Sequence, residues 1–516
     1  MFPIAQAALL FLSGDSDVVS QAFQDVEGIE LLSPAFTTPD SLPPGWANGT
    51  SGPTSDAVLQ SFYQSIAARN DWLTYQPGEF LSEEGRAIPY LFLAESAGSA
   101  ARNDTKLQVY IQAAIHGDEP AGDQAVAALI GKMDRNQTWT ASLLERISIK
   151  ILPRYNPDGV AYFQHQLASS LDGNRDHIKL DRQQSRDIKQ TFMDYIPHIS
   201  VDMHEFVGPT VYAGDYHIAA DAMISGGVNP NIHPDIRALL LDNFIPHMGD
   251  KLAVFGLRWE PYVIGASDGS RIVLAEAETP ARTGRNAYGL TQTVSFLCEM
   301  RGIMLAEQHF QRRVSTGLLQ LEAILETARN DFANVYTTIE RARREFINST
   351  EDIVVTDSPT LQNRTFTMID RNNGSVLQVP VDFYGTTPSV ANLTRPRPEA
   401  YLLPRTYSSL ASLLRTQGLE ISTLDHAFHG PVEALRITSS SLSDTLYEGH
   451  VRHTVTTSQR EREVHLPAGS FLVSTRQQNA ALAFVALEPE NVDSFVAFNL
   501  IPVGVGDEYP VYRVLA

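Results

Sequence analysis

The sequence of 516 residues contains a single cysteine, Cys298. One cysteine cannot form an intrachain disulfide or supply a thiolate cluster, so a metal site in this chain would have to use histidine and carboxylate side chains. Cys298 lies in an apolar segment, and we expect it to be a small buried hydrophobic residue rather than a nucleophile. The cysteine count by itself leaves the redox compartment open.

The sequence also lacks a long apolar run and an excess of basic residues. No stretch reaches the roughly 20 apolar residues that a membrane span requires. Lys and Arg total 39 against 60 Asp and Glu, which gives a formal net charge of -21 at pH 7. This charge repels phosphate backbones and anionic lipid, so we expect no nucleic-acid partner. The lack of a long apolar run is the reason that we expect no membrane span. The negative charge is typical of a soluble, often extracellular, surface.

The N-terminus carries a weak export signal. Residues 1–15 are largely apolar but lack a basic segment, so a signal peptide and a buried or frayed N-terminal segment both stay open as interpretations. Seven Asn-x-Ser/Thr sequons favour a secreted glycoprotein, at Asn48, Asn103, Asn136, Asn348, Asn363, Asn373 and Asn392.

The chain divides by composition into three parts. Residues 35–56 are rich in Pro, Gly, Ser and Thr, so we assign residues 1–54 to a lead-in with a possible signal peptide. Residues 55–350 alternate between strand and helix patterns, which predicts an α/β catalytic domain with a mixed, largely parallel central sheet flanked by helices. Residues 351–516 are rich in Val, Thr, Tyr and Pro, which predicts a C-terminal β-rich accessory domain.

Several elements can be placed from the apolar pattern. In the first domain we expect strands at 107–115, 147–152 and 198–203, helices at 121–133 and 185–195, and a long helical stretch from 303 to about 347. In the C-terminal domain we expect strands at 464–473 and 481–487 and a helix near 408–417.

The sharpest chemical signal is Ala-Ala-Ile-His-Gly-Asp-Glu-Pro-Ala-Gly at residues 113–122. His116 and Glu119, three apart on the turn between a strand and a helix, can aim a nitrogen and an oxygen at one point. Two histidines and one glutamate, with a fourth position left to water, form a common hydrolytic zinc site. The short string alone recurs by chance in large proteins, so it predicts a metal site only weakly.

Three further strings strengthen this interpretation. Pro-Arg-Tyr-Asn-Pro-Asp-Gly occupies 153–159, Asp-Gly-Asn-Arg-Asp-His occupies 172–177, and Val-Asp-Met-His-Glu-Phe occupies 201–206. Their order and spacing resemble the zinc carboxypeptidase family, and a later segment around 279–290 resembles a bacterial and fungal branch distinct from the digestive enzymes. The resemblance covers roughly residues 55–303.

The resemblance implies a metal site and a recognition site. It makes His116, Glu119 and His204 the ligands of one zinc ion per chain. It matches Asn174 and Arg175 to the pair that grips the terminal carboxylate of a peptide, and a guanidinium is well suited to that task.

The resemblance also implies a catalytic carboxylate. In Ser-Phe-Leu-Cys-Glu-Met-Arg-Gly at 295–302, Glu299 matches the residue that activates water, although a salt bridge with Arg301 is the plainer alternative. We expect Asp202 to hold a ligand histidine in orientation, where it could otherwise be only a solvated carboxylate.

Two departures from the family pattern leave alternatives open. The digestive enzymes have an arginine that polarises the scissile carbonyl, but residues 160–173 contain none. Arg154, Arg282 and Arg285 are the candidates to replace it. Tyr288 is the nearest candidate for the tyrosine that covers the substrate, and a packing role is the alternative. Glu205 is unusual beside His204 and is either structural or tunes the site.

The expected function is therefore zinc-dependent release of C-terminal amino acids from peptides, by water that Glu299 activates. The substrate would be a peptide or small amide with a free carboxylate. One alternative is a zinc amidohydrolase that deacylates amino acids or cuts cell-wall peptides. Another is a non-catalytic peptide-binding protein on the same scaffold, which is disfavoured because all four metal and base positions are filled.

Overall fold

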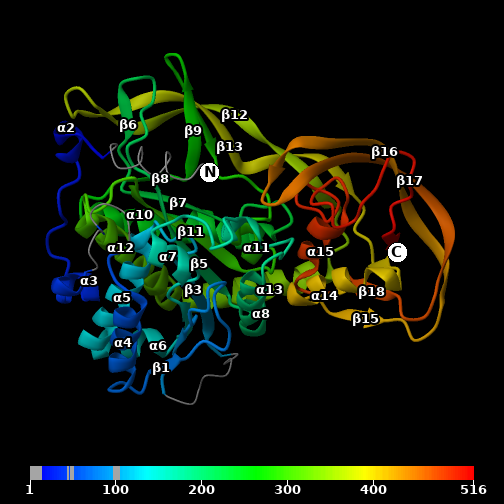
Figure 1. Cartoon of the computed structure of the whole chain (residues 1–516), viewed down its shortest axis with the longest axis horizontal. Helices are drawn as coiled ribbons and strands as arrows, with labels where there is room; N and C mark the ends of the chain where they lie inside the picture. Colours follow the sequence, from blue (N-terminus) through cyan, green and yellow to red (C-terminus); the bar gives the residue numbers. More distant parts are fainter. Residues whose placement is uncertain (1–13, 43–45, 47–51, 97–104, 516) are drawn as a thin grey trace.

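The described residues of the chain fold around three β-sheets, with the C-terminal residues beside the α/β body (Figure 1). The computed structural model describes residues 14–42, 46, 52–96 and 105–515. The N-terminal apolar stretch at 1–13 and the sequons at Asn48 and Asn103 lie outside these residues. In the described part of the chain, no helix combines the length and the apolarity that crossing a membrane would need.

The largest sheet has eight strands in the order β1-β2-β4-β3-β5-β11-β7-β8. Its central strands β4, β3, β5 and β11 are parallel, while β2 and β7 pair antiparallel to the strands beside them, which confirms the predicted mixed, largely parallel sheet. The strands span Leu73–Gln76 (β1), Tyr90–Leu93 (β2), Leu107–Ala113 (β3), Ile147–Leu152 (β4), Ile199–Val207 (β5), Ala222–Gly226 (β7), Trp259–Pro261 (β8) and Val294–Ile303 (β11). All residues of β3 are buried, as expected for a strand that helices cover on both faces.

Helices pack on this sheet, and α5 begins with Pro120, where the missing N–H costs nothing. The longer helices of the body are Asp56–Ala67 (α4), Pro120–Arg135 (α5), Gln137–Leu144 (α6), Gln183–Tyr195 (α8), Ile245–Val254 (α10), Phe310–Asn330 (α12) and Phe332–Asn348 (α13). The short helices are Asp17–Ser20 (α2), Pro34–Thr37 (α3), Pro157–Tyr162 (α7), Pro234–Ala238 (α9) and Gly284–Gly289 (α11). The helices predicted at 121–133 and 185–195 are confirmed, and the predicted long helical stretch consists of α12 and α13.

A second sheet has the order β6-β12-β13-β10-β9 and joins two parts of the chain. Its strands span Tyr216–Ile218 (β6), Val263–Asp268 (β9), Arg271–Glu276 (β10), Ile353–Asp370 (β12) and Val376–Arg395 (β13). The long ribbon of β12 and β13 pairs with β6 on one side and β10 on the other. Residues 353–395 therefore share a sheet with strands of the predicted catalytic domain.

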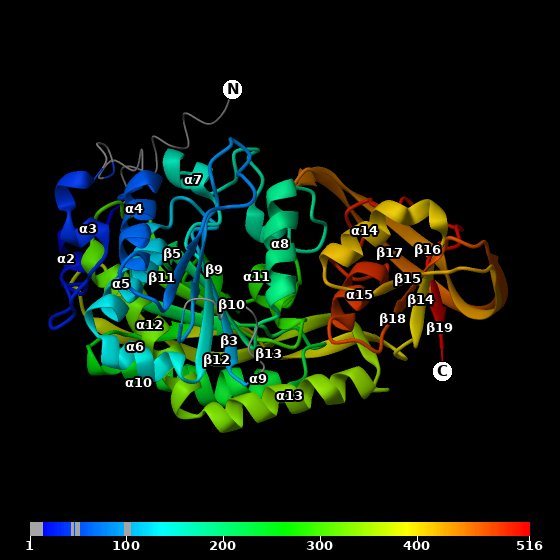
Figure 2. The same cartoon turned by 90° about the horizontal axis from the view of Figure 1, so that it is seen from below.

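The C-terminal sheet has the order β15-β18-β14-β19-β16-β17. Its elements are Ala400–Leu403 (β14), Ser408–Thr416 (α14), Ile421–Thr423 (β15), Phe428–Tyr447 (β16), His450–Leu466 (β17), Phe471–Ser474 (β18), Ala480–Leu487 (α15) and Tyr512–Val514 (β19). Figure 2 shows α14 beside α8 of the body. The predicted helix near 408–417 is confirmed, and the predicted strand at 464–473 is interrupted after Leu466.

The strand predicted at 481–487 is wrong, because these residues form helix α15. Every residue of α15 is buried, so its sequence is apolar throughout and shows neither a period of two nor one of 3.6. A short, fully buried helix cannot be told from a buried strand by pattern alone.

Candidate active site

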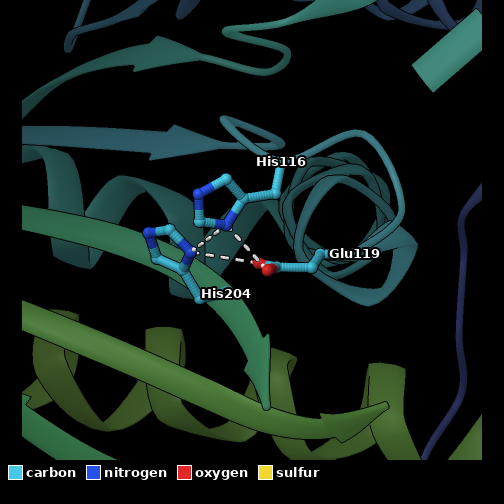
Figure 3. A group of neighbouring side chains, drawn as sticks. All are labelled: His116, Glu119 and His204. Atoms are coloured by element: carbon cyan, nitrogen blue, oxygen red, sulfur yellow. Dashed lines mark hydrogen bonds and ion pairs between the residues drawn. The ribbon is translucent and has the colours of Figure 1, made fainter. Parts of the chain in front are cut away.

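Two imidazoles and one carboxylate converge at the carboxyl ends of β3 and β5 (Figure 3). His116 follows β3, Glu119 immediately precedes α5, and His204 lies in β5. His116 Nδ1 lies 2.7 Å from Glu119 Oε1, while His204 Nδ1 lies 3.0 Å from Glu119 Oε2 and 3.2 Å from His116 Nδ1. Because β3 and β5 are parallel neighbours, their ends bring residues 88 positions apart to one point.

This donor set fits a zinc ion. Two nitrogens that each lie about 2.1 Å from a tetrahedral zinc ion are about 3.4 Å apart, close to the separation of the two Nδ1 atoms. The three donor atoms all lie within 4.8 Å of one another, and the three residues are buried. Two histidines and one glutamate also leave a fourth position for water or substrate.

A carboxylate lies against the outer nitrogen of each histidine. His116 Nε2 is 3.1 Å from Asp172 Oδ1, and His204 Nε2 is 3.1 Å from Asp202 Oδ2. Such a carboxylate keeps the ring proton on Nε2 and so directs the lone pair of Nδ1 to the centre of the cluster. Asp202 lies where the sequence predicts it, whereas Asp172 was missed, although it stands two residues before Asn174 in a motif already singled out.

The charges around the cluster favour a cation at its centre. Burial by itself lowers the pKa of His116, but the carboxylates of Glu119 and Asp172 outweigh burial and raise the pKa to about 10. Burial is likewise outweighed at His204, whose pKa rises well above its usual value because of Asp202 and Glu119. The surroundings hold positive charge on the rings, and a divalent ion would satisfy the same carboxylates.

Glu299 lies beside this cluster on the next strand. Glu299 in β11 is the register partner of His204 in β5, and its carboxylate lines the same pocket. Burial raises the pKa of Glu299 to about 8. In the described part of the chain its side chain makes no hydrogen bond or ion pair. The predicted salt-bridge alternative is not observed, because Arg301 pairs with Asp15 instead. Cys298 is buried, as predicted.

The cluster opens into a pocket of about 290 Å³. Besides the polar cluster, the pocket has a wall of aliphatic and Met side chains, formed by Val207, Ile218, Met223, Val263, Ile264, Leu297 and Ile303. A site of this kind buries an apolar group of the ligand and orients it with a few polar contacts.

Asn174 and Arg175 lie on the rim of this pocket, in a short 3₁₀ turn. The side-chain oxygen of Asn174 accepts a hydrogen bond from Gly284 N at 2.7 Å, and its Nδ2 lies 3.3 Å from His204 Nε2. Arg175 donates to the carbonyl of Asn174 at 2.9 Å and keeps about a third of its side chain exposed. The structure therefore brings the predicted recognition pair to the metal cluster.

Of the three arginine candidates for the missing cation, only Arg285 lines the pocket. Its guanidinium donates to the carbonyl of Glu278 at 2.9 Å, its Nε is buried without a partner, and no carboxylate of the described residues pairs with it. Arg282 forms an ion pair with Asp493 at 2.8 Å, outside the pocket.

The structure does not place Arg154 in the pocket, so the substrate-binding role predicted for it has no support. Arg154 donates to Asp123 and to Asp56, each at 2.6 Å, and it is almost fully buried. This is the structural ion pair that an arginine next to a motif more often forms, because a buried guanidinium requires compensating carboxylates.

Tyr288 is also outside the pocket and has the packing role given as its alternative. Its ring stacks on Phe192 at 4.0 Å between centroids, and its hydroxyl donates to Gln112 Oε1 at 2.8 Å. Two tyrosines line the pocket, Tyr212 and Tyr262, and Tyr262 lies between β8 and β9. Sequence reasoning missed both because no motif surrounds them. It also missed His165, whose ring stacks on that of His116 at 3.6 Å.

Glu205 has a structural role despite lining the pocket. Arg313 donates to both of its carboxylate oxygens, at 2.7 and 3.0 Å, and Ala121 N donates to Oε2 at 3.1 Å. With its oxygens occupied, Glu205 joins α12, β5 and the start of α5. The structure thus favours the structural interpretation of the two that the sequence left open.

The fold and the cluster define a metal-dependent hydrolase, and comparisons with known proteins identify its family. The zinc carboxypeptidase model matches residues 65–204. Carboxypeptidase 2 of Trichophyton tonsurans is 50% identical over 97% of this chain and 94% of its own length. Carboxypeptidase 2 of Trichophyton equinum is 49% identical over the same shares.

Solved structures of metallocarboxypeptidases are more distant. One from Burkholderia cenocepacia aligns with a TM-score of 0.42 and 16% identity, covering 54% of this chain and 70% of that one. Carboxypeptidase A from Helicoverpa armigera aligns with a TM-score of 0.40 and 16% identity, covering 54% and 73%.

The chain belongs to the zinc carboxypeptidase family, as its motifs predicted. It is a metallocarboxypeptidase, a hydrolase of peptide bonds.

Proposed function

We propose that this metallocarboxypeptidase holds one zinc ion through His116, Glu119 and His204 and uses Glu299 as its general base to release C-terminal amino acids from peptides. The observation that carries the proposal is the convergence of these four side chains, from three separate segments, on one pocket. A non-catalytic binding protein would have no use for a free buried carboxylate beside a complete set of metal donors.

The residues of the chain divide the chemistry among them. A bound zinc ion supplies Lewis acidity, which lowers the pKa of water and polarises a carbonyl oxygen. Glu299 takes the proton from the attacking water and passes it to the leaving amine, because one carboxyl group can act as base and then as acid. Asp172 and Asp202 keep both imidazoles oriented for this.

Two guanidiniums in the pocket bind negative charge at different stages of the reaction. We assign the partly exposed Arg175, with Asn174, to the terminal carboxylate of the substrate, since a planar fork of donors matches a carboxylate. We assign Arg285 to the carbonyl oxygen, where charge develops as water attacks. Arg285 suits this role because it is buried, unpaired with any described carboxylate, and lines the same pocket as Glu299.

The substrate assignment is tested with one peptide in two forms, a free C-terminal acid and a C-terminal amide. We expect the free acid to be cleaved with the higher kcat/KM. Arg175→Met should lower kcat/KM for the free acid about 10- to 150-fold, the loss expected when a charged hydrogen bond disappears. Equal cleavage of acid and amide by the wild-type chain would instead favour an amidohydrolase or an amidase.

We also propose that the chain is secreted and glycosylated. The five sequons within the described residues all have an exposed asparagine, at Asn136, Asn348, Asn363, Asn373 and Asn392, so each is accessible to a glycan. Protein from a eukaryotic expression host should lose mass on treatment with an endoglycosidase. An unchanged mass, with all sequons unmodified in peptide mapping, would argue against the proposal.

A further inference from the structure

The turn between β16 and β17 reaches from the C-terminal sheet to the loop that carries the recognition residues. Figure 2 shows this ribbon approaching the segment beside α8. Glu448 Oε2 accepts a hydrogen bond from Asp172 N at 2.8 Å, across 276 positions of the chain. The next contact lies at the other end of the loop, where His450 Nε2 is 2.6 Å from Asp181 Oδ2. The turn thus grips the 172–181 loop at two points.

Asp172 connects the contact with Glu448 to the active site. Its Oδ1 lies 3.1 Å from His116 Nε2 and accepts a hydrogen bond from Asn174 N at 2.7 Å. Its Oδ2 lies 3.6 Å from the guanidinium of Arg175. One carboxylate therefore orients a metal ligand and both recognition residues, and the backbone of that carboxylate is held by Glu448.

The backbone conformation of the turn indicates that the side chain of Glu448, and not the turn itself, accounts for a glutamate at this position. Glu448 and Gly449 both have positive φ, 49° and 81°, as in a two-residue hairpin turn in which Asn-Gly or Asp-Gly is preferred. A glutamate at such a position is strained by about 1–3 kcal/mol. The hydrogen bond that Asp172 N donates to the Glu448 carboxylate offsets that strain.

Further contacts hold the neighbouring part of the rim. Lys179 Nζ donates to Asp181 at 2.9 Å and to Asp176 at 2.8 Å. The contact between His450 and Asp181 is therefore connected to Asp176 in the same loop. Asp493 of the C-terminal region accepts from Arg282 N at 2.9 Å, two residues before the Gly284 that fixes the Asn174 amide.

We propose that the β16–β17 turn is a positioning element of the active site. Glu448 and His450 hold the 172–181 loop so that Asn174 and Arg175 meet the terminal carboxylate of the substrate. The C-terminal region is then part of the recognition machinery for that carboxylate. This inference rests on the substrate assignment above.

The test compares three variants with a matched control. Glu448→Gly removes the side chain and suits the positive φ, and Glu448→Gln restores an acceptor for Asp172 N. His450→Ala releases the other end of the loop and gives a second, independent variant should Glu448→Gly fold poorly. The control is Gln478→Ala, which removes a contact of the same two regions, from Gln478 Nε2 to Thr291 O at 2.7 Å, away from the loop.

For the peptide in its acid and amide forms, Glu448→Gly and His450→Ala should each lower kcat/KM for the acid about tenfold, mainly through KM, with less than a twofold change for the amide. Glu448→Gln should recover most of the loss, and Gln478→Ala should keep the wild-type preference. Zinc content and Tm should match those of the control.

Three outcomes overturn the inference. One outcome is that kcat/KM for the acid and for the amide fall by the same factor. Another is that the preference for the acid is unchanged in both Glu448→Gly and His450→Ala. Either result would mean that the turn only packs against the body, while the substrate assignment would stand. A wild-type chain without preference for the acid would overturn the substrate assignment and this inference with it.

Discussion

Replacing Glu299 with glutamine removes the proposed base while preserving the shape of the side chain. Glu299 is buried, and its carboxyl makes no hydrogen bond or ion pair within the described residues, so the substitution breaks no polar contact among them. Positioned acid–base catalysis contributes about 10²- to 10⁴-fold, and Glu299 is proposed to move the proton twice. We therefore expect kcat/KM to fall by about 10³- to 10⁴-fold, which corresponds to about 4–5.5 kcal/mol of transition-state stabilisation.

The assay is hydrolysis of a free-ended peptide, with zinc content measured on the same sample. Glu299→Gln should keep one zinc ion per chain, because its side chain is not among the three donors. Cys298→Ala, one residue away, is the matched control and should retain activity within about twofold, since Cys298 serves only as a small buried residue. Activity of Glu299→Gln within tenfold of wild type would refute Glu299 as the base.

Three other perturbations have defined outcomes. Asp202→Asn should weaken zinc binding about 10- to 100-fold in a competition titration with a chelator, because the His204 ring loses its orienting carboxylate; unchanged affinity would contradict that role. Asp15→Asn should lower the free energy of unfolding by about 3–5 kcal/mol at pH 7, since it leaves the buried Arg301 unpaired. Burial alone would raise the pKa of Asp15, but His309 and Arg301 outweigh burial and hold the pKa well below 3.8. The stabilisation is therefore present above pH 3.8 and is lost as the pH falls through the folded-state pKa. A difference in unfolding free energy between wild type and Asp15→Asn that stays constant down to pH 2 in denaturant melts would contradict this. Peptides that end in Lys should be cleaved more slowly than those that end in Leu, because two guanidiniums and an aliphatic wall line the pocket; a preference for Lys would overturn this argument.

The cluster of His116, Glu119 and His204 could be predicted because the order and spacing of its motifs resemble those of the zinc carboxypeptidase family. His116 and Glu119 lie within one strand–turn–helix segment, and His204 lies in a strand whose apolar pattern is clear. The strand at 147–152 was predicted with its observed bounds, since a buried parallel strand reads as an apolar run. Local patterns of this kind suffice to place residues at the carboxyl edge of a parallel sheet.

The rest of the pocket could not be predicted because distant segments build it. Arg154 lies beside a motif, yet its partners Asp123 and Asp56 come from two separate helices. Tyr262 enters the pocket from the link between β8 and β9, whose position depends on the second sheet. Contacts set by tertiary packing leave no signal in spacing or periodicity.

The second sheet shows why the division at residue 350 matters for the site. One hydrophobic cluster contains pocket residues of the predicted catalytic domain, such as Met223 and Val263, together with Phe366 and Phe383 of the β12–β13 ribbon. The ribbon also supplies the strand partners of β6 and β10. Because protein cores are close-packed, a shift of the ribbon would also move the apolar wall of the pocket. Residues after 350 therefore contact the pocket region from two directions, through the ribbon behind its apolar wall and through Glu448 beside the loop that carries Asn174 and Arg175.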